Sequence, residues 1–270
     1  MHFLRQNFFI GDKPIQALID VTGYRCKAVE GEMGTAFTGP VVCLDNHLNL
    51  RVQQESPKLC MTTINRSANK QLVTFTHEFS HIVNGLLRSV IMEPEKNKIT
   101  IRRGLLLEVY DMEDRDLNPV CHNMILDEVI NVFQTADMMR SICQLDRELL
   151  DDKVRDFFDK LDLSSISIPQ GYESITTKFR PLWENDVFRD SIDDNIIIGD
   201  IEKIEEHFDG IVGQSKLMKF SEALDNSFFC YTKGLRKIEN DFFIRKTICD
   251  YNKITGQKAI QKVKSRKFLD

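Results

Sequence analysis

The sequence has no cysteine pair at the spacing of a disulfide framework or a zinc knuckle. Its 7 cysteines are odd in number, widely scattered and without a C-x-x-C pair, which favours reduced thiols in a cytoplasmic protein. Pro (7) and Gly (13) are few, which excludes collagen-like repeats and wholesale disorder. No apolar run approaches the ~18 residues of a membrane-spanning helix, and the first residues lack the apolar core of an export signal. We therefore expect a soluble cytoplasmic protein with no membrane partner.

Positive charge is also in short supply, with 36 Lys and Arg against 41 Asp and Glu and a net charge of -5. Such a chain has no global basic field to attract nucleic acid, so we expect no nucleic-acid partner. Residues 252–270 are locally basic, and we interpret them as a solvated terminal helix rather than a phosphate-binding segment. Glycine-rich nucleotide-binding motifs and the G-x-S-x-G motif of serine hydrolases are absent.

The hydrophobic pattern changes along the chain. Residues 17–64 alternate short apolar runs with turn signals, which predicts a small, mostly antiparallel sheet. Apolar residues then recur every three or four positions, predicting a helix over 67–90. Residues 99–110 are rich in strand formers and carry Gly104, which predicts one bent strand or a hairpin. A second helix is expected over 124–145.

The second half of the chain has mainly helical patterning. A further helix is expected over 151–161, followed by a Ser-rich linker at 163–171. Beyond the linker, apolar residues form amphipathic faces at helical spacing. We therefore predict an α+β protein in which residues 1–162 form the domain with the sheet and residues 163–270 form a helical C-terminal subdomain.

The most informative motif is Thr76-His-Glu-Phe-Ser-His81, an H-E-x-x-H pattern within the predicted helix 67–90. Two histidines four residues apart lie about 40° apart on one helix face, so both imidazoles can bind one Zn²⁺ ion. Glu78 follows the first histidine, where it can hold a metal-activated water and take its proton as general base. The alternative is a metal-free helix with a packed His81, but apolar neighbours would then leave unpaired imidazoles beside the core.

A zinc site of this kind needs a third protein ligand. A third histidine six residues after His81 is excluded, because that position is Leu87. The next candidates lie on the predicted helix 124–145, where Asp127 and Glu128 are adjacent. Glu128 is favoured as the ligand, since it shares its side of the helix with polar residues. Asp127 is the fallback ligand or an acceptor for an imidazole N–H, and Asn131 is a second such acceptor.

The HExxH helix followed by Asp127-Glu-Val-Ile-Asn131 resembles the gluzincin class of zinc metallopeptidases. It is most similar to bacterial gluzincin-like proteins and more distantly to ImmA/IrrE-type intracellular metallopeptidases, over about residues 70–140. The resemblance implies a zincin-like fold, with His77, His81 and Glu128 as zinc ligands and Glu78 as general base. One departure is Val132, where thermolysin-type members carry an acidic residue four positions after the ligand glutamate.

Peptide hydrolysis develops an oxyanion, which usually has a hydrogen-bond donor besides the metal. Tyr172, His207 and Tyr231 are the downstream candidates. Tyr172 is our choice, because it follows the linker where the chain can pass over a cleft. Packing of Tyr172 at a domain seam is the competing interpretation. His122 can approach the metal or lie in an exposed loop.

The function expected from the sequence is zinc-dependent hydrolysis of a peptide or protein substrate by a zinc-activated water, with Glu78 as general base and Tyr172 as donor. One rival is a non-catalytic binding or regulatory protein that keeps a zincin fold. Intact Glu78 argues against it, because a structural zinc site does not need a base. A second rival is an intracellular regulatory protease or effector with one protein substrate. The oligomeric state is left open.

Overall fold

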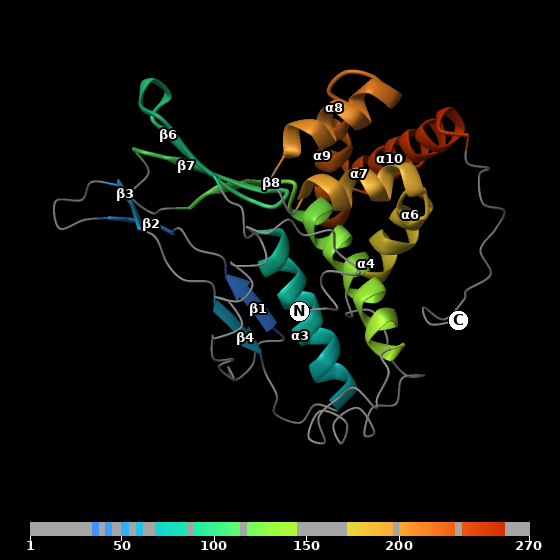
Figure 1. The fold of residues 1–270 in the computed structure, drawn as a ribbon. Helices are drawn as coiled ribbons and strands as arrows, with labels where there is room; N and C mark the ends of the chain where they lie inside the picture. The colour runs from blue at the N-terminus through green and yellow to red at the C-terminus, as the bar shows by residue number, and fades with distance from the viewer. Residues whose placement is uncertain are drawn as a thin grey trace.

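The structure is a computed structural model that describes ten stretches of the chain. These are residues 34–37, 41–44, 50–53, 58–61, 68–85, 89–113, 118–144, 172–196, 200–229 and 234–256. Helices predominate, and short antiparallel strands lie to one side of helix α3 (Ala68–Asn84) (Figure 1). The predicted α+β class is confirmed at this level. No helix among these stretches has the length and apolar character needed to cross a bilayer.

All strand pairs in the described stretches are antiparallel. Two separate two-stranded sheets and one four-stranded sheet form, with the orders β1-β4, β2-β3 and β5-β6-β7-β8. Their bounds are β1 (Gly34–Phe37), β2 (Val41–Leu44), β3 (Leu50–Gln53), β4 (Lys58–Met61), β5 (Ser89–Glu93), β6 (Lys98–Arg103), β7 (Leu106–Asp111) and β8 (Val120–His122). In place of the single small sheet expected over 17–64, the described strands of that range form two separate pairs, and the four-stranded sheet begins at residue 89.

The segment 99–110 is a hairpin, as one of the two predicted alternatives had it. Strands β6 and β7 pair from Lys98 with Asp111 to Arg103 with Leu106. Gly104 lies in the connecting turn with φ of 59°, in the left-handed region that favours glycine. The glycine thus marks a tight turn that brings its backbone close to helices α3 and α4 (Met124–Cys143).

Helix α3 is shorter than predicted. It ends at Asn84, and the amide of Gly85 bonds to the carbonyl of His81 at 2.9 Å. Residues 89–93 form strand β5, where Val90 pairs with Ile101 and Met92 with Ile99. The prediction of a helix to residue 90 was wrong, because pairing with β6 decides the conformation of this short apolar run and periodicity alone cannot detect it.

The second predicted helix is α4, which ends two residues before the predicted boundary. Five further helices follow in the described stretches, so the mainly helical character of the C-terminal part is confirmed there. They are α6 (Glu173–Trp183), α7 (Asp186–Ile196), α8 (Ile201–Val212), α9 (Lys216–Phe229) and α10 (Gly234–Ile254). The predicted helix 151–161, the linker 163–171 and the boundary between residues 162 and 163 lie outside the described residues, as does most of the basic segment 252–270.

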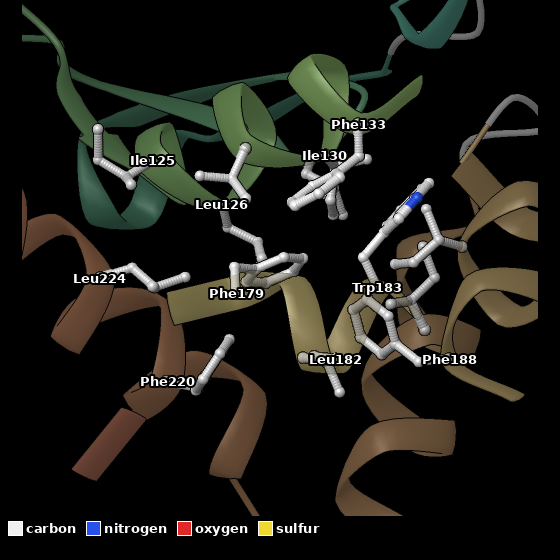
Figure 2. Close-up of a cluster of buried hydrophobic side chains, with 14 of the residues drawn as sticks. Ile125, Leu126, Ile130, Phe133, Phe179, Leu182, Trp183, Phe188, Phe220 and Leu224 are labelled. Carbon is white, nitrogen blue, oxygen red and sulfur yellow. The ribbon is translucent and has the colours of Figure 1, made fainter. Parts of the chain in front are cut away.

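The main apolar core lies between α4 and the C-terminal helices. Figure 2 shows side chains of α4, including Phe133, facing those of α6. Phe133 stacks on Phe179 and on Trp183, with ring centroids 6.0 and 5.6 Å apart. The same cluster continues through Phe188 of α7 and Phe220 of α9. One face of α4 is therefore held by apolar packing, which leaves its opposite face for α3.

Candidate metal centre

Helices α3 and α4 lie side by side, and their interface is unusually polar for a buried one (Figure 1). Each helix contributes buried side chains that carry nitrogen or oxygen atoms. From α3 these include His77, Glu78, Ser80 and Asn84, and from α4 they include Asp127, Asn131, Gln134 and Thr135. Burying so many polar groups is costly unless each has a partner, so this interface is specified by hydrogen bonds and charge.

The structure brings His77, His81 and Glu128 together. The Nε2 atom of His77 lies 3.4 Å from Oε2 of Glu128, and Nε2 of His81 lies 3.5 Å from Oε1 of the same carboxylate. One ligand atom from each of the three residues lies within 4.8 Å of the others. Three ligands at zinc distances in a tetrahedron are about 3.3 Å apart, so the observed spacing suits a metal ion between them.

The other ring nitrogens of both histidines face oxygen acceptors. Nδ1 of His81 lies 3.2 Å from Oδ2 of Asp127, and Nδ1 of His77 lies 3.4 Å from Oγ1 of Thr135. The Thr135 hydroxyl donates to the carbonyl of Asn131 at 2.7 Å, so its oxygen can accept from His77. With a metal ion bound between them, each imidazole would carry its proton on Nδ1 and direct its Nε2 lone pair toward the metal.

This arrangement needs positive charge between the three side chains. The Oε2 atom of Glu128 is buried and accepts no hydrogen bond from the residues that the structure describes. Two nitrogen lone pairs and a carboxylate that face one another without a cation would repel. The donors, two imidazoles and one carboxylate, are those that Zn²⁺ and related divalent metals use. The group can therefore hold a metal ion, and it leaves a coordination position for a water or substrate.

The pKa shifts of the site residues also indicate that positive charge is stabilised at its centre. Burial lowers the pKa of His81, but Asp127 and Glu128 raise it by more, so its pKa lies well above the ordinary value. Burial raises the pKa of Glu128, but the facing imidazoles lower it by more, so its pKa is below the ordinary value and the carboxylate stays ionised. The site favours positive charge at its centre, supplied by a proton or by a metal ion.

Asp127 accepts hydrogen bonds from three directions. Besides His81, it accepts from the backbone amide of Leu105 at 3.2 Å and from Nδ2 of Asn131 at 3.1 Å. Its carboxylate thus connects the β6–β7 turn to the imidazole of α3. The sequence had left Asp127 open as ligand or as acceptor, and the contacts place it as the acceptor behind His81, with Asn131 behind Asp127.

A chain of amide side chains extends the site between the helices. Asn84 donates from Nδ2 to Oδ1 of Asn131 at 2.9 Å and to Oε1 of Gln134 at 2.6 Å. Gln134 in turn donates to Asp193 of α7 at 3.2 Å. Burial raises the pKa of Asp193 to about 6. These contacts fix the rotation of α4 about its own axis relative to α3, which decides which carboxylate faces the imidazoles.

Tyr172 lies at this site although it is 44 positions beyond Glu128 in the chain. Burial raises the pKa of its hydroxyl, and the carboxylates of Glu128 and Glu78 raise that pKa further. The hydroxyl therefore lies close to both carboxylates. Glu78 itself is buried, with an exposed fraction of 8%. Among the downstream candidates in the described stretches, Tyr172 is thus the one that lies near these carboxylates, and its role as donor stays a prediction.

The other candidates lie elsewhere or outside the described residues. His207 is paired with the hydroxyl of Tyr251 at 2.9 Å, within the C-terminal helices. Tyr231 is outside the described residues. His122 is exposed on β8 and does not belong to the metal group. Of the two interpretations of His122, exposure is confirmed, but the residue ends a short strand and does not lie in a loop.

Sequence reasoning did not assign a role to Thr135 or to the Leu105 amide. Thr135 follows Asp127 and Asn131 at intervals of four, so the three residues form one polar stripe on α4. That stripe could have identified Thr135 as the acceptor behind His77. The sequence pattern does not identify the Leu105 amide as a donor, because every residue except proline carries such a group.

Comparisons of the chain with known protein families, with curated proteins and with solved structures find no match. The interpretation of the site therefore rests on the residues and their geometry.

Gly104 offers a test of how closely the turn approaches this site. A Cβ atom there would lie 3.2 Å from the carbonyl oxygen of Asn84 and 3.3 Å from Oδ1 of Asp127. We expect Gly104→Ala to destabilise the protein by about 2 kcal/mol in urea unfolding, since left-handed backbone alone costs an alanine about 1 kcal/mol. We also expect about 10-fold weaker metal binding, because Asp127 must shift.

Gly256→Ala is the matched control. Gly256 also has a left-handed backbone, with φ of 76°, but nothing lies within 4 Å of its Cβ position. This variant should lose the unfolding free energy that a left-handed backbone costs an alanine, and its metal affinity should be unchanged. Equal effects of both substitutions on metal affinity would contradict the proposed approach of the turn to Asp127.

Proposed function

We propose that this protein is a zinc-dependent metallopeptidase of gluzincin type, with a zincin-like arrangement of the HExxH helix and a glutamate-bearing helix. The observation that carries the proposal is the convergence of both Nε2 atoms on Glu128, while each Nδ1 faces an oxygen acceptor. A site that only needed structural zinc would have no use for Glu78, a buried carboxylate adjacent to the first ligand.

His77, His81 and Glu128 would hold the zinc ion. Zinc bound there would polarise a substrate carbonyl and lower the pKa of a water molecule. Glu78 takes the proton of the attacking water and delivers it to the departing amine nitrogen. The Tyr172 hydroxyl donates a hydrogen bond to the oxyanion that develops on the carbonyl. Asp127 and Thr135 keep the imidazoles in the required orientation and tautomer.

The preferred partner is a peptide or protein substrate in the cytoplasm. Unrestricted proteolysis inside a cell would be hazardous, which favours a narrow range of substrates. A regulatory protease with one protein substrate fits the same site. A non-catalytic zincin-fold binder is the remaining alternative. Such a binder would hold the metal without cleaving a peptide, whereas either kind of protease would cleave one.

The test is digestion of a mixed peptide library, read by mass spectrometry, with protein purified without added metal. We expect cleavage by the wild type, loss of cleavage after chelation, and recovery when stoichiometric zinc is added. Bound zinc without cleavage of the library or of a proteome digest would favour the non-catalytic binder. Failure to bind zinc after its addition would contradict the metal centre itself.

A further inference from the structure

Tyr172 comes from the C-terminal helical part, and its carbonyl group is bonded into the first turn of α6. It precedes α6, and its carbonyl oxygen accepts hydrogen bonds from the amides of Ile175 and Thr176 and from the Thr176 hydroxyl, at 2.9 to 3.1 Å. Only the two side-chain torsions of the tyrosine then decide where its hydroxyl lies. The neighbours of the ring therefore control the distance from the hydroxyl to the metal group.

One face of the Tyr172 ring is covered by Phe228 of α9. The two rings stack, with centroids 5.6 Å apart and planes inclined by 13°. Both residues are partly buried and pack against the main core. Rotation of the tyrosine about either torsion would break this stack. The stack thus favours the observed orientation, in which the hydroxyl lies near Glu128.

The end of α9 that carries Phe228 is held by contacts among three helices. Its neighbour Ser227 donates to Oδ1 of Asp241 on α10 at 2.5 Å. Lys178 on α6 donates to the same oxygen at 2.7 Å and to the Ser227 hydroxyl at 3.3 Å. These partly buried contacts tie the end of α9 to the helix that begins beside Tyr172. The spacing between Phe228 and Tyr172 is therefore set by the C-terminal helices as a unit.

We propose that Phe228 is a positioning residue, which holds the Tyr172 hydroxyl at the metal centre by stacking on its ring. The inference rests on the proposed function and deepens it, because it assigns to the C-terminal helical part the task of completing the site. A hydrogen bond to a developing oxyanion needs its donor placed within about 0.5 Å. Misplacement by about 1 Å can reduce a rate by 10²-fold, so a supporting ring can have a measurable effect without contacting substrate.

A purely structural role of Phe228 makes a different prediction. A phenylalanine that only fills space affects folding and leaves the effect of the tyrosine hydroxyl unchanged. A positioning residue acts through that hydroxyl, so its replacement has no further effect once the hydroxyl is removed. A double-mutant cycle between Phe228→Ala and Tyr172→Phe separates the two roles.

The probe is acetohydroxamate, a small chelating anion whose oxygen atoms imitate the oxyanion at the metal. Its dissociation constant is measured from the visible absorption of protein loaded with Co²⁺. We expect about 10-fold weaker binding in Tyr172→Phe, which loses one hydrogen bond to a charged group. We expect a loss of about 5-fold in Phe228→Ala and, in the double variant, no loss beyond that of Tyr172→Phe.

Two further variants act as controls. Phe228→Tyr keeps the ring and should bind acetohydroxamate as the wild type does. This variant also tests the role of the ring if the alanine variant fails to fold. Phe242→Ala removes a phenylalanine of α10 that is 69% exposed and should change nothing. Cobalt content should be equal in all variants, because none of these residues is a ligand.

Independent losses that multiply in the double variant would overturn the positioning role, and so would wild-type affinity in Phe228→Ala. Failure of the wild type to bind Co²⁺ would instead overturn the metal centre, and with it both the proposed function and this inference. Bound Co²⁺ with an unaltered affinity in Tyr172→Phe would remove Tyr172 from the site while leaving the metal centre intact.

Discussion

Glu128→Ala protein purified without added metal should contain almost no zinc, whereas the wild type should contain about one zinc per chain. Glu128 is the only acidic side chain among the described residues whose oxygens face both Nε2 atoms, at 3.4 and 3.5 Å. Its loss removes one of three ligands and the negative charge at the centre. We expect metal affinity to fall by more than about 100-fold, which elemental analysis and competition with a chelator would measure.

Asp127→Asn is the informative comparison, because the two carboxylates are adjacent in the chain. Asp127 contacts Nδ1 of His81 and the Leu105 amide, so we expect only about a 10-fold loss in metal affinity. Glu222→Ala, at an exposed glutamate of α9, should leave metal content unchanged. The reverse order, with Asp127→Asn losing the metal and Glu128→Ala retaining it, would make Asp127 the ligand.

Glu78→Gln should abolish hydrolysis while leaving metal content unchanged. The substitution conserves size at a buried position but removes the group that accepts the proton of the attacking water. We expect kcat on a peptide cleaved by the wild type to fall by about 10³-fold, in the upper part of the range for general acid–base catalysis. Stopped assays of that peptide, together with zinc content, would measure both properties.

The exposed Glu222→Gln is the matched control and should keep wild-type kcat. Retention of more than about a tenth of the wild-type rate in Glu78→Gln would show that another group takes the proton. Loss of the metal along with the activity would instead show that Glu78 contributes to metal binding.

Hydrophobic periodicity located the helices of this protein better than it located their ends. The 3.6-residue period located α3 and α4 and the helical character of the C-terminal part. It failed at the end of α3, since residues 89–93 are a strand whose partner, β6, comes later in the chain. It also did not show that the strands within 34–61 form two separate pairs, because strand pairing is non-local.

The metal group combines local and non-local information. The pair His77 and His81, with Glu78 between them, follows from positions on one helix, so the sequence identifies these three residues. The choice between Asp127 and Glu128 depends on the rotation of α4, which the amides of Asn84, Asn131 and Gln134 decide. Adjacent residues point about 100° apart on a helix, so a small rotation would exchange their roles.

By itself, the sequence determined an α+β chain with an HExxH helix, a following helix that bears two candidate carboxylates, and a helical C-terminal part. Only the tertiary structure decided that Glu128 faces the imidazoles, that Asp127 and Thr135 stand behind them, and that Phe228 stacks on Tyr172 beside the site. The reason is physical. Helical periodicity acts over a few residues, whereas these contacts depend on how helices far apart in the chain pack against one another.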